Sequence, residues 1–139
     1  MIILDTNVIS ALMRSEPDPG VVRWLDTLPP EFLWTTAVTV FEVQFGLEIL
    51  TAGRRRRLLE AAFIAALKED FEGRVLPFDQ AAAKAAGSIA AERRRTGRTV
   101  EIRDVQIAGI AKARKAAIAT RNLRHFEGFG VDLLDPWST

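Results

Sequence analysis

The chain has 139 residues, of which 48% are hydrophobic and 27% are charged, and it contains no cysteine. This composition predicts one soluble globular domain, residues 1–139, and the absence of thiols excludes disulfides and thiolate chemistry. The formal net charge is only +1, so a nucleic-acid surface would have to come from local clusters of Lys and Arg. No apolar run approaches the roughly 20 residues of a membrane span, and the N-terminus lacks the basic segment of a signal peptide, so we expect no membrane association and a cytoplasmic location.

The first residues of the chain predict a short buried strand that ends in a carboxylate. Ile2, Ile3 and Leu4 are apolar in succession, and Asp5 follows them directly. In open parallel α/β sheets, ligands bind beyond the carboxyl ends of the strands, so Asp5 is expected at a binding edge. Thr6 is predicted to cap the helix that follows.

Further strands and helices alternate along the rest of the chain. We expect strands at 32–35, 75–78, 116–120 and 131–134, and helices at 21–28, 36–50, 54–73, 80–95 and 101–115. This alternation predicts an α/β fold, with a largely parallel sheet of four to five short strands. The helix at 36–50 is apolar on nearly all sides and is therefore predicted to be buried.

Two acids interrupt apolar helix faces. Glu42 projects from an apolar face of the helix at 36–50, and burying an unpaired charge costs several kcal/mol. Its alternative explanations are a salt bridge to an arginine, or a helix turned so that Glu42 reaches solvent. Asp104 suits the helix dipole in the first turn of 101–115, but it shares a face with Ile107 and Ala111 and so points inward.

Other polar residues lie at or just after the ends of predicted strands. Asp79 follows the strand at 75–78, and capping of the helix at 80–95 accounts for it fully. Thr120, Asn122 and His125 follow the strand at 116–120 and should reach the same crevice as Asp5. Thr120 and Asn122 offer neutral oxygen ligands, whereas His125, the only histidine, is either a catalytic group or a structural one.

Asp5, Glu42 and Asp104 together favour a hard metal ion. Carboxylates suit Mg²⁺ or Mn²⁺, whereas Zn²⁺ would prefer more nitrogen or sulfur ligands. The matching chemistry is phosphodiester hydrolysis, because such an ion neutralises the phosphate and activates water. Metal-free RNA cleavage by two histidines is excluded, since the chain has one histidine.

The motifs of the chain resemble those of a known family. They are Leu4-Asp5-Thr6-Asn7-Val8-Ile9-Ser10, Glu42 followed by Phe45-Gly46, Arg103-Asp104-Val105-Gln106-Ile107-Ala108, Ala119-Thr120-Arg121-Asn122, Phe126-Glu127-Gly128 and Pro136-Trp137. The set resembles PIN-domain proteins, and more closely the FitB-like branch of the VapC toxins from bacterial type II toxin–antitoxin pairs.

This resemblance implies a three-layer α/β/α PIN-like fold and a Mg²⁺- or Mn²⁺-dependent endoribonuclease that acts on RNA. It also implies a homodimer that a small antitoxin holds inactive, in a complex that binds operator DNA through the antitoxin. Asp5, Glu42 and Asp104 fall on the family's first three acidic positions. Thr6, Asn7, Thr120, Asn122 and His125 are expected to support them.

The chain departs from the family at the fourth acidic position, where His125 replaces a carboxylate. A second metal ion is therefore disfavoured, and a PIN-like binding module that no longer cuts RNA is an alternative to the nuclease. A phosphotransfer enzyme with Asp5 as nucleophile is a third interpretation, but it would want a second acid at position 7, where Asn7 stands.

Basic residues gather in two segments. Arg54–Arg57 is interpreted as a solvated helix face. Arg93, Arg94, Arg95 and Arg98, together with Arg121, are candidates for contacts with RNA phosphates.

Overall fold

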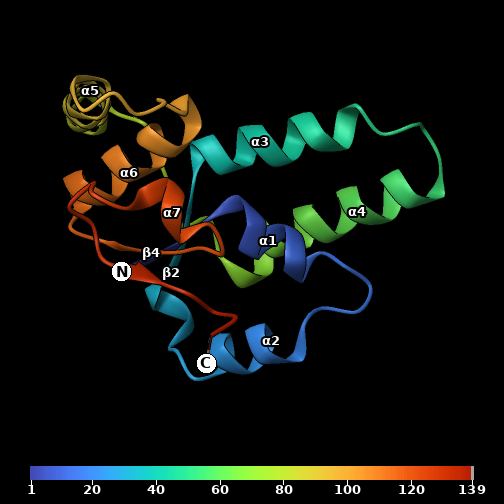
Figure 1. Ribbon diagram of the computed structural model, residues 1–139. Helices are drawn as coiled ribbons and strands as arrows, with labels where there is room; N and C mark the ends of the chain where they lie inside the picture. Colours follow the sequence, from blue (N-terminus) through green and yellow to red (C-terminus); the bar gives the residue numbers. More distant parts are fainter. Residues whose placement is uncertain (139) are drawn as a thin grey trace.

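A five-stranded parallel sheet forms the centre of the computed structural model, which describes residues 1–138 (Figure 1). The strand order is β3-β2-β1-β4-β5, with β1 (Ile2–Leu4) in the middle. The others are β2 (Leu33–Thr36), β3 (Val75–Leu76), β4 (Ala117–Ala119) and β5 (Leu133–Leu134). All four pairings are parallel, so every strand points its carboxyl end at the same edge.

Alternation along the short strands divides the core between the two faces of the sheet. Ile3 is paired with Ile118 of β4, and both belong to the cluster that contains residues of α5 (Gln80–Arg95) and α6 (Ile102–Arg114). Leu4 and its partner Ala119 belong to the opposite cluster, which contains residues of α1 (Thr6–Leu12), α2 (Pro19–Asp26), α3 (Ala37–Glu48) and α4 (Arg54–Ala65).

The predicted three-layer α/β/α architecture is therefore confirmed. Three short helical segments complete the described chain, namely η1 (Pro30–Phe32), the π-helical η2 (Ala66–Asp70) that continues α4, and α7 (Leu123–Phe126). No helix was predicted from the sequence where α7 lies. Within residues 1–138 no helix has the length and apolar character needed to cross a membrane.

The full burial predicted for the helix at 36–50 is wrong. Helix α3 extends from the sheet and forms a projecting hairpin with α4 (Figure 1). Phe41, Phe45 and Ile49 are 55%, 50% and 69% exposed, whereas Val43 and Leu47 on the other side of α3 are buried. The apolar pattern is real, but within the described chain one side of α3 stays largely exposed.

Asp79 and Asp5 both cap helices, the first as predicted and the second not. Asp79 accepts a hydrogen bond from Ala82 N at 3.0 Å and caps α5, which confirms its structural assignment. The prediction that Thr6 caps α1 is wrong, because Asp5 is the cap and accepts from Thr6 N at 2.8 Å. Thr6 is thus the first residue of α1, and its hydroxyl is free to bond elsewhere.

Close packing of α5 on α6 generates a stability prediction. A Cβ at Gly109 of α6 would lie 2.5 Å from Ala82 O and 2.6 Å from Ala86 Cβ, so Gly109→Ala should destabilise the protein by about 1–3 kcal/mol. Gly87 of α5 has open space around it, and Gly87→Ala should stabilise by about 0.5–1 kcal/mol. Urea unfolding of both variants tests the pair, and equal effects would show that the two helices are not held at this separation.

Candidate functional site

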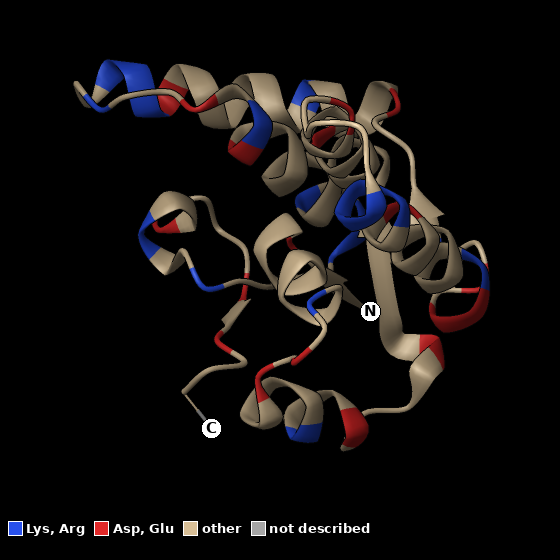
Figure 2. Cartoon of the chain, turned by 90° about the vertical axis from the view of Figure 1, so that its right-hand side faces the viewer, with Lys and Arg blue, Asp and Glu red and all other residues tan. Residues whose placement is uncertain are grey.

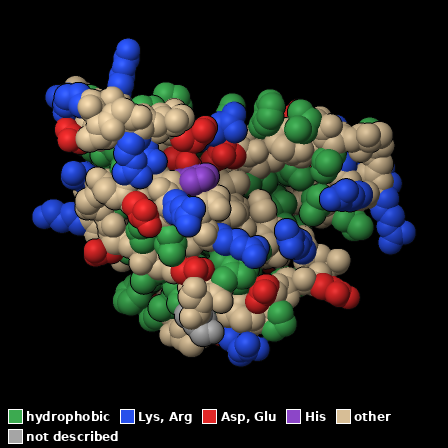
Figure 3. All heavy atoms as spheres, viewed as in Figure 1, with side chains coloured by type: hydrophobic (Ala, Val, Ile, Leu, Met, Phe, Trp, Pro, Cys, Tyr) green, Lys and Arg blue, Asp and Glu red, His purple; other side chains and the backbone are tan. Residues whose placement is uncertain are grey.

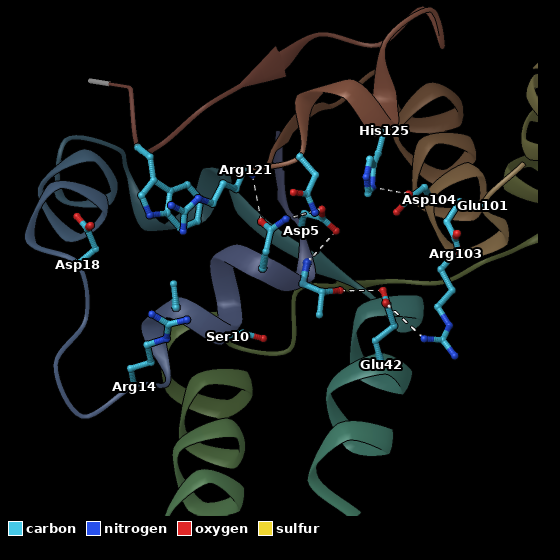
Figure 4. A pocket seen from close by; sticks show the side chains of 15 residues that line it. Asp5, Ser10, Arg14, Asp18, Glu42, Glu101, Arg103, Asp104, Arg121 and His125 are labelled. Atoms are coloured by element: carbon cyan, nitrogen blue, oxygen red, sulfur yellow. Dashed lines mark hydrogen bonds and ion pairs between the residues drawn. The ribbon is translucent and has the colours of Figure 1, made fainter. Parts of the chain in front are cut away.

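A cleft of about 550 Å³ opens beyond the carboxyl ends of the strands (Figures 3 and 4). Its lining combines carboxylates with a smaller number of arginines and a few neutral residues. The charged residues are Asp5, Asp18, Glu42, Glu101, Asp104, Arg14, Arg103 and Arg121, and the others include Thr6, Asn7, Asn122, His125 and Trp137. The space-filling view shows the histidine directly beside a group of acidic side chains. The structure thus brings the three predicted acids to one cleft.

Asp5 is the most buried acid of the cleft, at 5% exposure. Its Oδ1 accepts from Thr6 N, and its Oδ2 accepts from the Thr120 hydroxyl at 2.8 Å. Burial raises the pKa of Asp5, and these two hydrogen bonds and the charge of His125 only partly oppose that effect. The carboxylate is therefore firmly oriented, but its burial disfavours the ionised form.

Asn7 and Thr120 tie the end of β4 to the start of α1. Asn7 Nδ2 donates to Thr120 Oγ1 at 3.2 Å and to Asp5 Oδ2 at 3.3 Å. Thr120 is fully buried, and its hydroxyl also accepts from Asn122 N at 3.0 Å. The Asn122 side chain lines the cleft and makes no capping bond to α7. These neutral groups fix the position of Asp5 and add no charge of their own.

Glu42 enters the cleft from α3. Its Oε1 accepts from the Thr6 hydroxyl at 2.8 Å, and its Oε2 lies 3.7 Å from Arg103 Nη1. Glu42 therefore has an arginine partner, as one of the alternatives expected, and it also lines the cleft. Burial raises the pKa of Glu42 most, and nearby Asp5 and Glu101 raise it further, while Thr6 and Arg103 lower it.

Asp104 enters from the first turn of α6, with its side chain directed inward as predicted. The buried Oδ2 atom lies 3.0 Å from His125 Nδ1 but receives no hydrogen bond with acceptable geometry. Burial and then the charge of Asp5 raise the pKa of Asp104 to about 6, against the pull of His125. Asp104 is thus a carboxylate with an unused acceptor atom.

The donor set fits a hard divalent cation. Carboxylate oxygens are the ligands that Mg²⁺ and Mn²⁺ prefer, and Asp104 Oδ2 is an orphaned acceptor at the cleft. A cation would also relieve the repulsion that raises the pKa values of neighbouring acids. Within residues 1–138, no three acidic, histidine or cysteine side chains stand close enough together in this structure to hold an ion.

The candidate RNA-binding arginines divide into two groups. Arg121 lines the cleft, whereas Arg94, Arg95 and Arg98 do not. Figure 2 shows basic residues gathered toward one end of a long helix, which is α5. Arg93 donates through Nε to Thr99 O at 2.8 Å and lies over the Phe129 ring, so it joins the end of α5 to the following loop.

The sequence did not predict several residues of the cleft, among them Glu101, Arg103 and Trp137. Glu101 was not singled out in the sequence, although it lies one turn before Asp104 and so on the same side of α6. Arg103 and Trp137 were noted only within motifs. Their place in the cleft depends on how α6 and the C-terminal segment pack, and no local pattern signals it.

A parallel sheet with an acidic cleft at its carboxyl edge defines an α/β protein whose ligand site is built from carboxylates. The sequence matches the PIN domain family over residues 2–129. It is 39% identical to the VapC ribonuclease Y4jK of Sinorhizobium fredii over 99% of this chain and 98% of that one. It is 35% identical to toxin FitB of Neisseria gonorrhoeae, with 99% of each chain covered.

Solved structures agree with these sequence comparisons. The structure of FitAB bound to an IR36 DNA fragment superposes with a TM-score of 0.89 at 35% identity, covering 99% of this chain and 96% of that one. The chain therefore belongs to the PIN-domain family, within the group that holds the VapC and FitB toxins.

The raised pKa of Asp104 predicts a pH-dependent stability in metal-free buffer. A carboxyl whose pKa rises from 3.8 to about 6 on folding contributes stability that is fully present below pH 3.8 and lost as pH rises through 6. Asn cannot ionise, so Asp104→Asn should gain stability over the wild type between pH 4 and pH 7, on the order of 1–2 kcal/mol.

Thermal melting in EDTA across this pH range measures the difference. Asp132→Asn, at an exposed carboxylate outside the cleft, is the matched control and should show no such trend. A difference that shrinks with rising pH would contradict the assignment of a strained carboxyl at Asp104.

Proposed function

We propose that the protein is a Mg²⁺- or Mn²⁺-dependent endoribonuclease that serves as the toxin of a type II toxin–antitoxin pair. The observation that carries this proposal is the convergence of Asp5, Glu42 and Asp104 at the carboxyl edge of the sheet, where the buried Asp104 Oδ2 lies near His125 but accepts no hydrogen bond of acceptable geometry. The 39% identity to a VapC ribonuclease supports the reaction class. The 35% identity to toxin FitB supports the biological role.

Asp5, Glu42 and Asp104 would hold the ion. When bound, the ion supplies charge neutralisation at the scissile phosphate and a water of lowered pKa. Thr6 orients two of the acids at once, because its N–H bonds Asp5 and its hydroxyl bonds Glu42. Thr120 fixes the second oxygen of Asp5, and His125 lies within reach to hold a proton beside Asp104.

The proposed partners are a small antitoxin, a second copy of the chain and RNA as substrate. Operator DNA would be bound through the antitoxin, which the likeness to a DNA-bound FitAB complex supports. Exposed Phe41, Phe45 and Ile49 on α3 offer the antitoxin an apolar surface that borders the acidic cleft. A guanidinium or ammonium group of the antitoxin placed near Asp5, Glu42 or Asp104 would then oppose metal binding. The proposed location is the cytoplasm.

A PIN-like binding module that does not cut RNA is the second candidate. The observation that favours it is His125, which stands 3.0 Å from Asp104 at the position where the resemblance to PIN-domain proteins implies an acid. With one carboxylate fewer, the cleft attracts a cation less strongly.

Cleavage of RNA by the purified chain, freed of any co-purified partner, separates the two candidates. We expect cleavage of structured RNA with Mg²⁺ or Mn²⁺ and none in EDTA. Asp5→Asn and Asp104→Asn should each reduce the cleavage rate by at least a hundredfold, because each removes a negative ligand of the ion.

Melting temperature and circular dichroism show whether these variants remain folded. Asp132→Asn, at an exposed carboxylate outside the cleft, should cleave at the wild-type rate. Cleavage that persists undiminished in EDTA would refute metal dependence. RNA binding without any cleavage would establish the binding module instead.

A further inference from the structure

Two arginines of the cleft each lie over an aromatic ring. The guanidinium carbon of Arg121 is 5.1 Å from the centre of the Trp137 ring. That of Arg103 is 5.2 Å from the Phe41 ring and 5.8 Å from the Phe45 ring. Figure 4 shows the two arginines on opposite sides of Asp5. Asp5, at the centre of the cleft, therefore has a stacked guanidinium on each side.

Each of these arginines is also tied to the acids through the backbone or by charge. Arg121 N donates to Asn7 Oδ1 at 3.2 Å, and Asn7 in turn bonds Asp5. Arg103 directly precedes Asp104 in α6 and lies 3.7 Å from Glu42. The backbone of Arg121 and the guanidinium of Arg103 thus take part in the contacts that build the cleft.

Stacking on a ring restricts a guanidinium without occupying its N–H donors. The Arg103 side chain is 43% exposed, Arg121 is also exposed, and both residues line the cleft, so a ligand in the cleft can reach both side chains. Guanidinium groups bind phosphate through paired hydrogen bonds, and Arg held on a ring loses less conformational entropy on binding than a free one. A polyanion that enters a cleft of five carboxylates needs such cations on its path.

We propose that Arg121 and Arg103 bind the backbone phosphates on the two sides of the scissile phosphate, and so set the register of the RNA strand over the acids. This inference rests on the proposed ribonuclease function. The strand then crosses the cleft from Trp137 at the C-terminal segment to Phe41 on α3. The basic end of α5, with Arg94 and Arg95, lies outside this path.

Salt dependence of RNA binding tests the assignment. Anisotropy of a fluorescein-labelled single-stranded RNA oligonucleotide is measured in EDTA over a series of KCl concentrations. Arg121→Gln and Arg103→Gln should each weaken binding several-fold at low salt and reduce the slope of log K against log[KCl] by about 0.7, the value for one phosphate contact on a single strand. Where metal-free affinity is too weak to titrate, kcat/KM for cleavage is followed over the same series.

Three further variants isolate the mechanism. Arg121→Lys and Arg103→Lys keep the charge and should restore the slope, while affinity stays below that of the wild type because the paired hydrogen bonds are lost. Trp137→Leu should weaken binding with the slope unchanged, since it removes the ring and not the charge. Arg55→Gln, at an exposed position on α4 outside the cleft, is the matched control and should behave as wild type.

Several outcomes would overturn the inference. Wild-type affinity and slope in both Arg121→Gln and Arg103→Gln would show that neither arginine binds a phosphate. A loss of affinity in only one of the two variants would refute the two-sided arrangement. An equal loss in Arg55→Gln would show diffuse attraction without defined phosphate sites. A wild-type protein that neither binds nor cleaves RNA contradicts the ribonuclease proposal itself, and is thus distinguishable from these results.

Discussion

The structure depends on a buried carboxylate placed where the central strand becomes a helix. Asp5 ends β1, caps α1 and lies in the cleft, so one side chain serves the backbone and the site together. The Thr6 N–H and the Thr120 hydroxyl both donate hydrogen bonds to this buried carboxylate. Thr6 lies just after β1 and Thr120 just after β4, the strand that pairs with it. Any shift of β4 relative to β1 would therefore remove a hydrogen bond from a charged group that has little access to water.

Electrostatic strain accumulates around that carboxylate. The pKa values of Asp5, Glu42 and Asp104 are all raised, chiefly by burial, and the charge of Asp5 raises those of the other two. The sheet and its two cores supply the stability that holds these groups together. Such a concentration of unfavourable charge in an otherwise well-packed protein is typical of a functional site.

Much of this arrangement could be predicted from sequence, because strand ends and helix faces are local patterns. Asp5 follows an apolar run and Asp104 lies on an apolar helix face, so both could be placed in the cleft before the structure was known. The cap of α1 was assigned to Thr6 because Asp and Thr one residue apart are both good caps, and only the hydrogen bonds distinguish them. The roles of Arg103 and Trp137 could not be predicted, since both depend on contacts between elements distant in sequence.

The exposure of α3 has a consequence for the site. An apolar helix face predicts that something packs against it, but the sequence does not say whether that is another part of the same chain. Here Phe41 and Phe45 face outward from the helix that carries Glu42 inward, and Arg103 contacts both rings and that acid. The outer surface of α3 and the acidic cleft therefore share one guanidinium. Whatever packs on these phenylalanines also changes the surroundings of Arg103, and through it the charge balance at Glu42.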